Sequence, residues 1–260
     1  MTSPAASPPT ATAPARRGFG WQALGALAFL SVIPLPRRAH GLPTAITLAC
    51  FAPAGLLLGG AVAGLDLGLG HVLPAGATSA VVLATLVGLC GAMHLDGLMD
   101  SADGLFGSRD TARRLEIMRD SRVGGYGVAA AALVLLLQYG ALAAVGTARP
   151  LALLTAVGLS RAASAFGLGI ARPARAEGLG SVFSVDRRAL AGIVALGLAA
   201  AAAIVLGGWR GVGASTVAVV VVLGVVALFR RRVGGMTGDG FGAVVELSLA
   251  GALLCFAAHP

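Results

Sequence analysis

Residues 189–207 read ALAGIVALGLAAAAAIVLG and contain no charged or hydrogen-bonding side chain. At a rise of about 1.5 Å per residue, a helix of this length nearly crosses the hydrocarbon core of a bilayer, which is about 30 Å thick. The stretch lacks the alternation of polar and apolar residues that marks a barrel strand. It therefore predicts a transmembrane helix and decides the fold class.

Similar stretches recur along the chain, and they predict about seven spans: 44–64, 72–93, 124–147, 150–170, 189–207, 212–229 and 240–258. Small residues are dense in these stretches, as helix packing in lipid favours. Residues 20–35 are also apolar, but arginine pairs and prolines bound them, so they could cross the membrane or form a re-entrant or interfacial helix. We expect an all-α, polytopic transmembrane helix bundle.

The composition of the whole chain agrees with this fold class. Apolar residues make up 57% of the chain, charged residues only 12%, and the mean hydropathy is +0.88. Soluble domains carry about 25% charged residues, so the composition excludes a soluble globule, and its hydrophobicity excludes general disorder. Residues 1–17 are rich in Pro, Ala, Ser and Thr without an early positive charge, which predicts a disordered tail rather than a secretory signal. The rest, 18–260, is expected to be one integral-membrane domain.

The charged residues are distributed unevenly across the predicted membrane. All nineteen basic residues are arginines, which excludes Schiff-base lysine and P-loop lysine chemistry. Successive loops of a helix bundle lie on opposite sides of the membrane. On this basis, sixteen arginines and ten of the eleven acids fall on one side. Only Arg149, Arg210 and Asp66 fall on the other side, and Arg161 is embedded. Because the arginine-rich side is cytoplasmic, the net charge of +8 reports orientation, and no nucleic-acid partner is expected.

The densest acidic cluster is HLDGLMDSADGLFGSRD, residues 94–110. Asp96, Asp100 and Asp103 fall at i, i+4 and i+7, which share one face of a helix. Three such carboxylates repel each other unless a cation lies among them, and Mg²⁺ usually takes one or two carboxylates plus substrate phosphates. Gly97 and Gly104 permit close approach of a ligand to the backbone. The cluster predicts a Mg²⁺–diphosphate site at the cytoplasmic surface; the alternative is a solvated amphipathic loop.

The next segment, TARRLEIMRDSRVGGYG at 111–127, has an apolar and a basic side. It could be an interfacial helix held by lipid headgroups, or a phosphate clamp, because the planar fork of arginine suits phosphate oxygens. The adjacent acids favour the clamp for Arg119 and Arg122. Asp120, between them, is a further candidate for substrate binding.

A second acidic element, GGMTGDGFGAVVE at 234–246, opens the last span. Asp239 is expected at the cytoplasmic mouth and Glu246 inside the membrane, where a carboxylate is costly and is by default a functional candidate. Arg161, inside the span 150–170, either pairs with Glu246 or binds a substrate phosphate. His94, which begins the acidic cluster, could be a general base, a ligand or a polar residue at a helix end.

Three sets of candidate residues follow. The catalytic set is Asp96, Asp100, Asp103, His94 and Asp239; the substrate-binding set is Arg119, Arg122, Arg161, Asp120 and Glu246; the metal set is Asp96, Asp100, Asp103 and Asp239.

The segment 94–127 together with 234–246 resembles the cobalamin synthase family, the adenosylcobinamide-GDP ribazoletransferases. Lesser matches are 29–36 (FLSVIPLP), Ser160-Arg161 and 178–183 (GLGSVF). The chain departs from the family pattern at Arg119, where lysine is common, and in its extended tail.

The resemblance implies a late step of vitamin B12 assembly in the bacterial cytoplasmic (inner) membrane. Such an enzyme joins adenosylcobinamide-GDP to α-ribazole, or its 5′-phosphate, and releases GMP with the help of Mg²⁺. Asp96, Asp100 and Asp103 would bind Mg²⁺, and Asp239 would be a further ligand or a base. Arg119, Arg122 and Arg161 would neutralise phosphate. The base that deprotonates the ribose hydroxyl could be His94 or an aspartate. The expected partners are these small molecules and the lipid bilayer, and an oligomer is possible.

Other functions fit the sequence less well. A CDP-alcohol phosphotransferase is expected to carry D-G-x-x-A-R, but Leu105, Phe106 and Gly107 follow Gly104 here. A UbiA-like prenyltransferase is expected to have two N-D-x-x-D loops, and the second element here has one aspartate. A transporter usually places its site at the midplane between repeats, whereas this chain shows no repeat and concentrates its acids at one surface.

Overall fold

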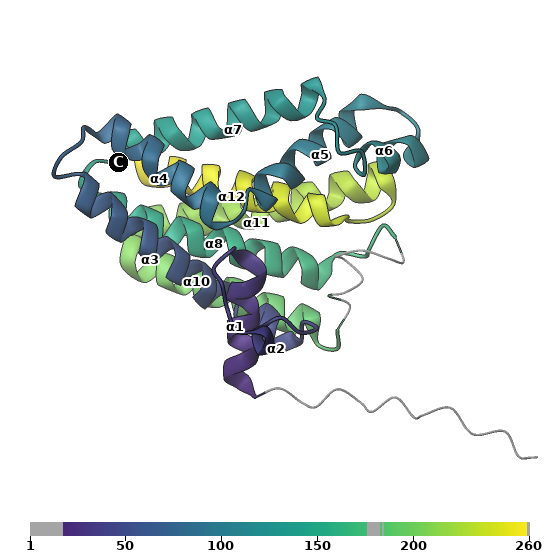
Figure 1. Ribbon diagram of the computed structural model, residues 1–260, viewed down its shortest axis with the longest axis horizontal. Coiled ribbons are helices and arrows are strands. Elements are labelled where there is room, and N and C mark those ends of the chain that lie inside the picture. Colours follow the sequence, from purple (N-terminus) through teal and green to yellow (C-terminus); the bar gives the residue numbers. More distant parts are fainter. Residues whose placement is uncertain (1–17, 176–182, 184, 259–260) are drawn as a thin grey trace, which may run out of the picture.

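The computed structural model describes residues 18–175, 183 and 185–258, and over these it is a bundle of helices (Figure 1). The helices are α1 (Phe19–Leu30), α2 (Ala45–Ala49), α3 (Phe51–Leu69), α4 (Ala75–Leu89), α5 (Met93–Gly107), α6 (Thr111–Ile117), α7 (Gly125–Ala144), α8 (Arg149–Ile170), α10 (Arg188–Gly207), α11 (Trp209–Val233) and α12 (Gly238–Ala257). Short 3₁₀ turns cover Arg37–Ala39 and Gly146–Ala148. The predicted tail, 1–17, and most of the run 178–183 lie outside the described residues.

The predicted fold class is confirmed. Six helical segments of the described chain are long and apolar enough to cross a membrane: Ala45–Leu69, α7, Gly146–Ile170, α10, α11 and α12. The bent pair of α4 and α5 raises the number to seven if it counts as one span. Helix α1 has twelve residues, or about 18 Å, which favours the re-entrant or interfacial interpretation of this segment over a crossing.

The predicted span 72–93 is not one straight helix. Helix α4 has fifteen residues, and α5 begins at Met93 at an angle of 87° to it. Gly91 and Ala92, between the two helices, have positive φ angles of 58° and 56°, so a left-handed turn redirects the chain. Because of this turn, the acidic cluster lies on a helix of its own that packs against α7 and α12.

Helix α8 forms the centre of the bundle, where α3, α10, α11 and α12 pack around it. Small residues allow this packing: a Cβ on Gly59 of α3 would lie 2.7 Å from the carbonyl oxygen of Leu154 in α8. Arg161 lies on this central helix and is one of the most buried large side chains of the described chain, 1% exposed. The core therefore surrounds a cation.

A buried ion pair joins four helices at one end of the bundle. Arg149 at the start of α8 pairs with Asp66 of α3. Its guanidinium also donates to Ser79 Oγ of α4 (2.9 Å) and to the carbonyl oxygen of Leu142 in α7 (2.8 Å). The sequence places Asp66 and Arg149 on the same side of the membrane, and the structure brings them into contact.

Candidate functional site

The two acidic elements meet where α5 crosses α12. A Cβ on Gly97 would lie 2.8 Å from the carbonyl oxygen of Asp239, and a Cβ on Gly242 would lie 2.8 Å from that of His94. Only glycines allow the two backbones to approach this closely. The crossing thus brings together two motifs that lie far apart in the sequence.

Three of the predicted catalytic side chains line one cavity of about 120 Å³ beside this crossing: His94, Asp96 and Asp239. Ser164 and Leu168 of α8 and Phe29 of α1 also line this cavity. Phe29 also packs edge-on against Phe183, at 5.0 Å between ring centroids, so two of the lesser sequence matches are in contact. Asp100 lies close enough for its carboxylate to interact electrostatically with Asp96, Asp239 and Asp103.

The carboxylates suit a magnesium ion that takes part of its coordination from a substrate. Among the described residues, no three His, Cys, Asp or Glu side chains are close enough to form a metal cage. Asp96 and Asp239 nevertheless offer oxygen donors from two helices to the same cavity. Mg²⁺ usually binds through one or two carboxylates plus substrate phosphates, so this donor set fits it without a complete protein cage.

Asp103 has a different environment from the other acids of α5. Its two carboxylate oxygens accept hydrogen bonds from the backbone N–H groups of Gly124 (2.7 Å) and Gly127 (2.9 Å). A side chain on either glycine would clash with this carboxylate. Asp103 therefore connects α5 to the first turn of α7, where orphan N–H groups and the helix dipole favour a negative charge.

We expect Asp103→Asn to lower the stability of the protein by about 1–2 kcal/mol, because an amide oxygen replaces only one of the two acceptors. The Mg²⁺ affinity should stay unchanged. Thermal unfolding in detergent and Mg²⁺ titration calorimetry would measure the two effects. Weaker Mg²⁺ binding with unchanged stability would instead make Asp103 the metal ligand that its spacing predicts.

The two arginines of the predicted phosphate clamp, Arg119 and Arg122, have different surroundings. Arg122 forms an exposed ion pair with Asp120, 2.7 Å between Nη2 and Oδ2. Hydrogen bonds from the Arg122 side chain and backbone lower the pKa of Asp120 to about 2. An exposed pair of this kind contributes little to stability, so a phosphate can displace the carboxylate at small cost. Arg119 is exposed and forms no ion pair with any described residue.

Arg175 is a candidate that the sequence did not single out. Its Nη2 donates to the carbonyl oxygen of Leu115 in α6 (2.6 Å), and its Nε is buried without a partner among the described residues. Burial, followed by the charge of Arg119, lowers the pKa of Arg175, and Asp239 opposes that shift. Its local sequence, ARPARA, resembles any other arginine-rich loop, so only the packing of α6 and α12 reveals it.

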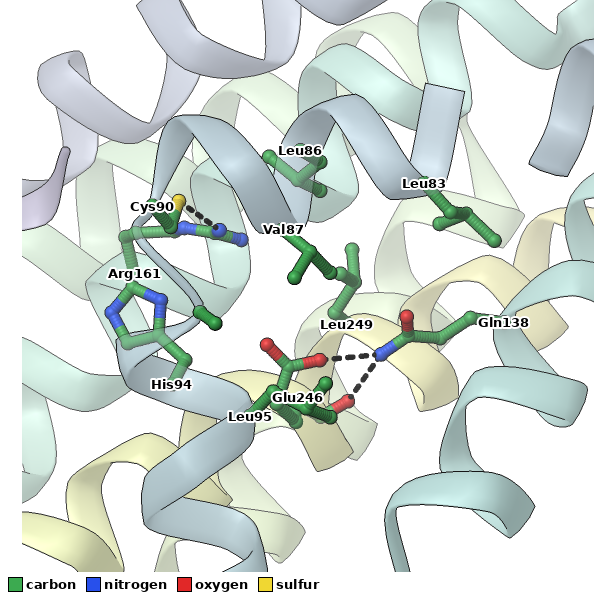
Figure 2. A pocket seen from close by; sticks show the side chains of 11 residues that line it. Leu83, Leu86, Val87, Cys90, His94, Leu95, Gln138, Arg161, Glu246 and Leu249 are labelled. Carbon is green, nitrogen blue, oxygen red and sulfur yellow. Dashed lines mark hydrogen bonds between the residues drawn. The ribbon is translucent and has the colours of Figure 1, made fainter. Parts of the chain in front are cut away.

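Arg161 and Glu246 belong to a separate, buried cluster, shown in Figure 2. Arg161 donates to Ser160 Oγ (2.9 Å) and Cys90 Sγ (3.3 Å), and Gln138 donates to Glu246 Oε2 (2.8 Å). The Arg161 and Glu246 side chains line a small cavity of about 10 Å³ and interact electrostatically.

The size of this cavity bears on the two interpretations of Arg161. A cavity of about 10 Å³ has room for roughly one water molecule and none for a phosphate group. The geometry therefore favours charge compensation between Arg161 and Glu246 over a direct contact of either with substrate. His94 lines this cavity and the larger one, so it connects the buried pair to the aspartates. Its Nδ1 has no hydrogen-bond partner in the described structure.

Comparisons with known proteins identify a matching family and several relatives. The family model described as cobalamin-5-phosphate synthase matches residues 22–257. A protein of Roseiflexus sp. named adenosylcobinamide-GDP ribazoletransferase is 39% identical over 235 residues, which cover 88% of this chain and 86% of that protein. No solved structure matches the chain.

Two further relatives carry the same name over shorter alignments. The protein of Deinococcus radiodurans is 43% identical over 121 residues, covering 46% of this chain and 45% of the relative. That of Thermosynechococcus vestitus is 46% identical over 122 residues, covering 45% of this chain and 49% of the relative. In these two alignments, the chain spans about half the length of the curated relative.

Proposed function

Since this chain belongs to the cobalamin-5-phosphate synthase family, we propose that it is an adenosylcobinamide-GDP ribazoletransferase of late cobalamin biosynthesis. It joins adenosylcobinamide-GDP to α-ribazole, or its 5′-phosphate, and releases GMP. The observation that carries the proposal is the meeting of Asp96 and Asp239, from two separate motifs, in one cavity. Paired carboxylates there suit a substrate that carries a diphosphate and a divalent cation.

The reaction transfers a phosphoryl group between two oxygens. A ribose hydroxyl oxygen bonds to a diphosphate phosphorus, the bond from that phosphorus to the bridging oxygen breaks, and GMP leaves with the electron pair. The hydroxyl proton needs an acceptor, and both His94 and Asp239 line the cavity. Asp239, at the start of α12, offers a partly exposed carboxylate, whereas Nδ1 of His94 is unpaired but buried.

The charge on the phosphates is balanced by this chain's carboxylate-held cation and its arginines. Asp96 and Asp239 would hold Mg²⁺, with Asp100 nearby. When bound, Mg²⁺ neutralises the phosphoryl oxygens and orients the diphosphate. Arg175, and Arg119 beside it, would bind phosphate oxygens at the mouth of the cavity.

The cavity would face the cytoplasm of a bacterial inner membrane. In Figure 1, α6 and the start of α12 lie at one end of the bundle, while α12 ends at the other. The last turn of α11, with Arg230, Arg231 and Arg232, precedes α12 at the same end as the cavity. Such a concentration of arginines at one end of the spans supports a cytoplasmic position for the site.

The test is release of GMP by the purified protein in nanodiscs, given Mg²⁺, adenosylcobinamide-GDP and α-ribazole. We expect GMP and a cobalamin product in equal amounts, and neither when α-ribazole is left out. GMP release that does not depend on α-ribazole would indicate a hydrolase. Absence of GMP from folded protein, with either α-ribazole or its 5′-phosphate, would contradict the proposal.

The glycine crossing gives a prediction for this activity. Gly97→Ala should lower turnover by about 10²-fold, because the new Cβ pushes α5 away from α12 and separates Asp96 from Asp239. Gly107→Ala is the matched control on the same helix, since its Cβ would meet nothing closer than 3.6 Å. GMP release measures both variants. Equal turnover in both would show that the close crossing has no part in the activity.

A further inference from the structure

A third cavity, of about 280 Å³, lies outside the candidate site. It is enclosed by the C-terminal ends of α8 and α11 and by the segment that leads into α12. Its lining includes Arg172, Val226, Arg230 and the segment Gly234 to Met236. No acid belongs to this lining, so the cavity carries positive charge only.

The two arginines of this cavity are available to a ligand. Arg172 follows α8 and Arg230 lies in the last turn of α11, and both are exposed. Within the described parts of the chain, neither side chain forms a hydrogen bond or an ion pair. The planar guanidinium fork matches phosphate oxygens, so two such groups, one just after α8 and one in the last turn of α11, favour a phosphate-bearing anion.

The walls of the cavity are fixed by backbone contacts. The N–H of Met236 donates to the carbonyl oxygen of Arg172 (2.8 Å), and the N–H of Ala174 donates to that of Met236 (2.9 Å). A Cβ on Gly235 would lie 2.7 Å from the Arg172 carbonyl oxygen, so glycine is needed for this approach. The cavity is therefore formed before any ligand arrives.

An apolar stripe leads along α11 to this cavity. Val220 and Leu223 are exposed at 63% and 50%, and Leu223 lies about one helical turn before Val226 and two turns before Arg230. In a membrane-spanning helix such a stripe contacts acyl chains. A free phosphate would use the arginines only, whereas a phospholipid would use the arginines and the stripe together.

We propose that this cavity binds the headgroup of an anionic phospholipid, with the phosphate between Arg172 and Arg230 and an acyl chain along α11. Basic pockets between helices on the cytoplasmic side of a membrane are suited to such headgroups. The ligand would contact the segment Gly234 to Met236, which leads directly into the helix that carries Asp239. It does not enter the catalytic cavity, so the proposal does not depend on the reaction assigned above.

The test compares lipid binding to three proteins after delipidation in a neutral detergent: the unaltered chain, Arg172→Gln/Arg230→Gln and Arg231→Gln/Arg232→Gln. The last two lose the same charge from the same end of the bundle, but Arg231 and Arg232 do not line the cavity. Native mass spectrometry would follow titration with phosphatidylglycerol and with phosphatidylcholine. Binding measures the site directly, so an inactive enzyme would not affect the outcome.

We expect the unaltered protein to bind one phosphatidylglycerol in preference to phosphatidylcholine. The cavity variant should weaken this binding about 25-fold, or about fivefold per arginine, and the control variant at most about twofold. Equal weakening in both variants would overturn the proposal in favour of general surface attraction. Equal binding of the two lipids, or displacement of the lipid by millimolar inorganic phosphate, would overturn it as well.

Discussion

Asp239→Asn is expected to lower the rate of GMP release by about 10³-fold while the protein stays folded. Asp239 lines the cavity with Asp96, and its charge also acts on Asp100. The substitution keeps the size of the side chain but removes the negative charge that would hold a cation against the diphosphate. Since it also relieves repulsion among these carboxylates, thermal unfolding in detergent should occur at an equal or higher temperature.

The control for this variant is Asp186→Asn, which removes an exposed carboxylate outside the cavity and should leave turnover unchanged. If Asp96 and Asp239 hold one ion, the variant that lacks both should be little worse than either single variant, because groups that act as a unit are not additive. If Asp239→Asn turns over substrate as fast as the unaltered protein at limiting Mg²⁺, then Asp239 does not hold the metal ion.

The spans could be predicted from the sequence because lipid imposes a composition on them. Residues 189–207 have no polar side chain, and in the structure they lie within α10, Arg188–Gly207. Hydropathy could not show that the span 72–93 breaks at Gly91 and Ala92. The break depends on two left-handed residues, and alanine gives no sign of adopting that conformation.

The acids of the site could be predicted as a group, but their separate environments could not. The spacing of Asp96, Asp100 and Asp103 predicts one helix face, and all three lie on α5. Which neighbour covers each part of that face depends on tertiary packing. Asp96 faces a cavity, whereas Asp103 meets the first turn of α7 through Gly124 and Gly127.

Contacts between residues that are far apart in the sequence could be identified only from the fold. The sequence predicts that Arg161 either pairs with Glu246 or binds a phosphate, and the small size of the cavity between them favours the first. Arg175 became a candidate only when α6 and α12 placed it beside Arg119 and Asp239. Charge counting assigned Arg175 to the arginine-rich side but could not distinguish it from an arginine that only sets orientation.

Removal of either partner of the buried Asp66–Arg149 pair is expected to lower the free energy of unfolding by about 3–5 kcal/mol, because the remaining charge stays buried without compensation. The side chains of Asp66 and Arg149 are only 5% and 11% exposed. Arg149 also donates hydrogen bonds to Ser79 Oγ and to the Leu142 carbonyl oxygen. Asp66→Leu and Arg149→Met would be measured by denaturation in mixed micelles. Arg210→Met is the matched control, since Arg210 lies over the ring of Trp209 and forms no ion pair with a described residue.

The double variant Asp66→Leu/Arg149→Met distinguishes the net contribution of the ion pair to stability from the cost of leaving one buried charge unpaired. It removes both charges, so it should be more stable than either single variant, with a residual loss of about 1–2 kcal/mol from the unpaired Ser79 and Leu142 groups. GMP release below the unfolding temperature should be unchanged, because the pair lies at the end of the bundle away from the cavity. Additive losses in the double variant would show that the two charges do not compensate each other, and the four helices would then depend on packing alone at this end.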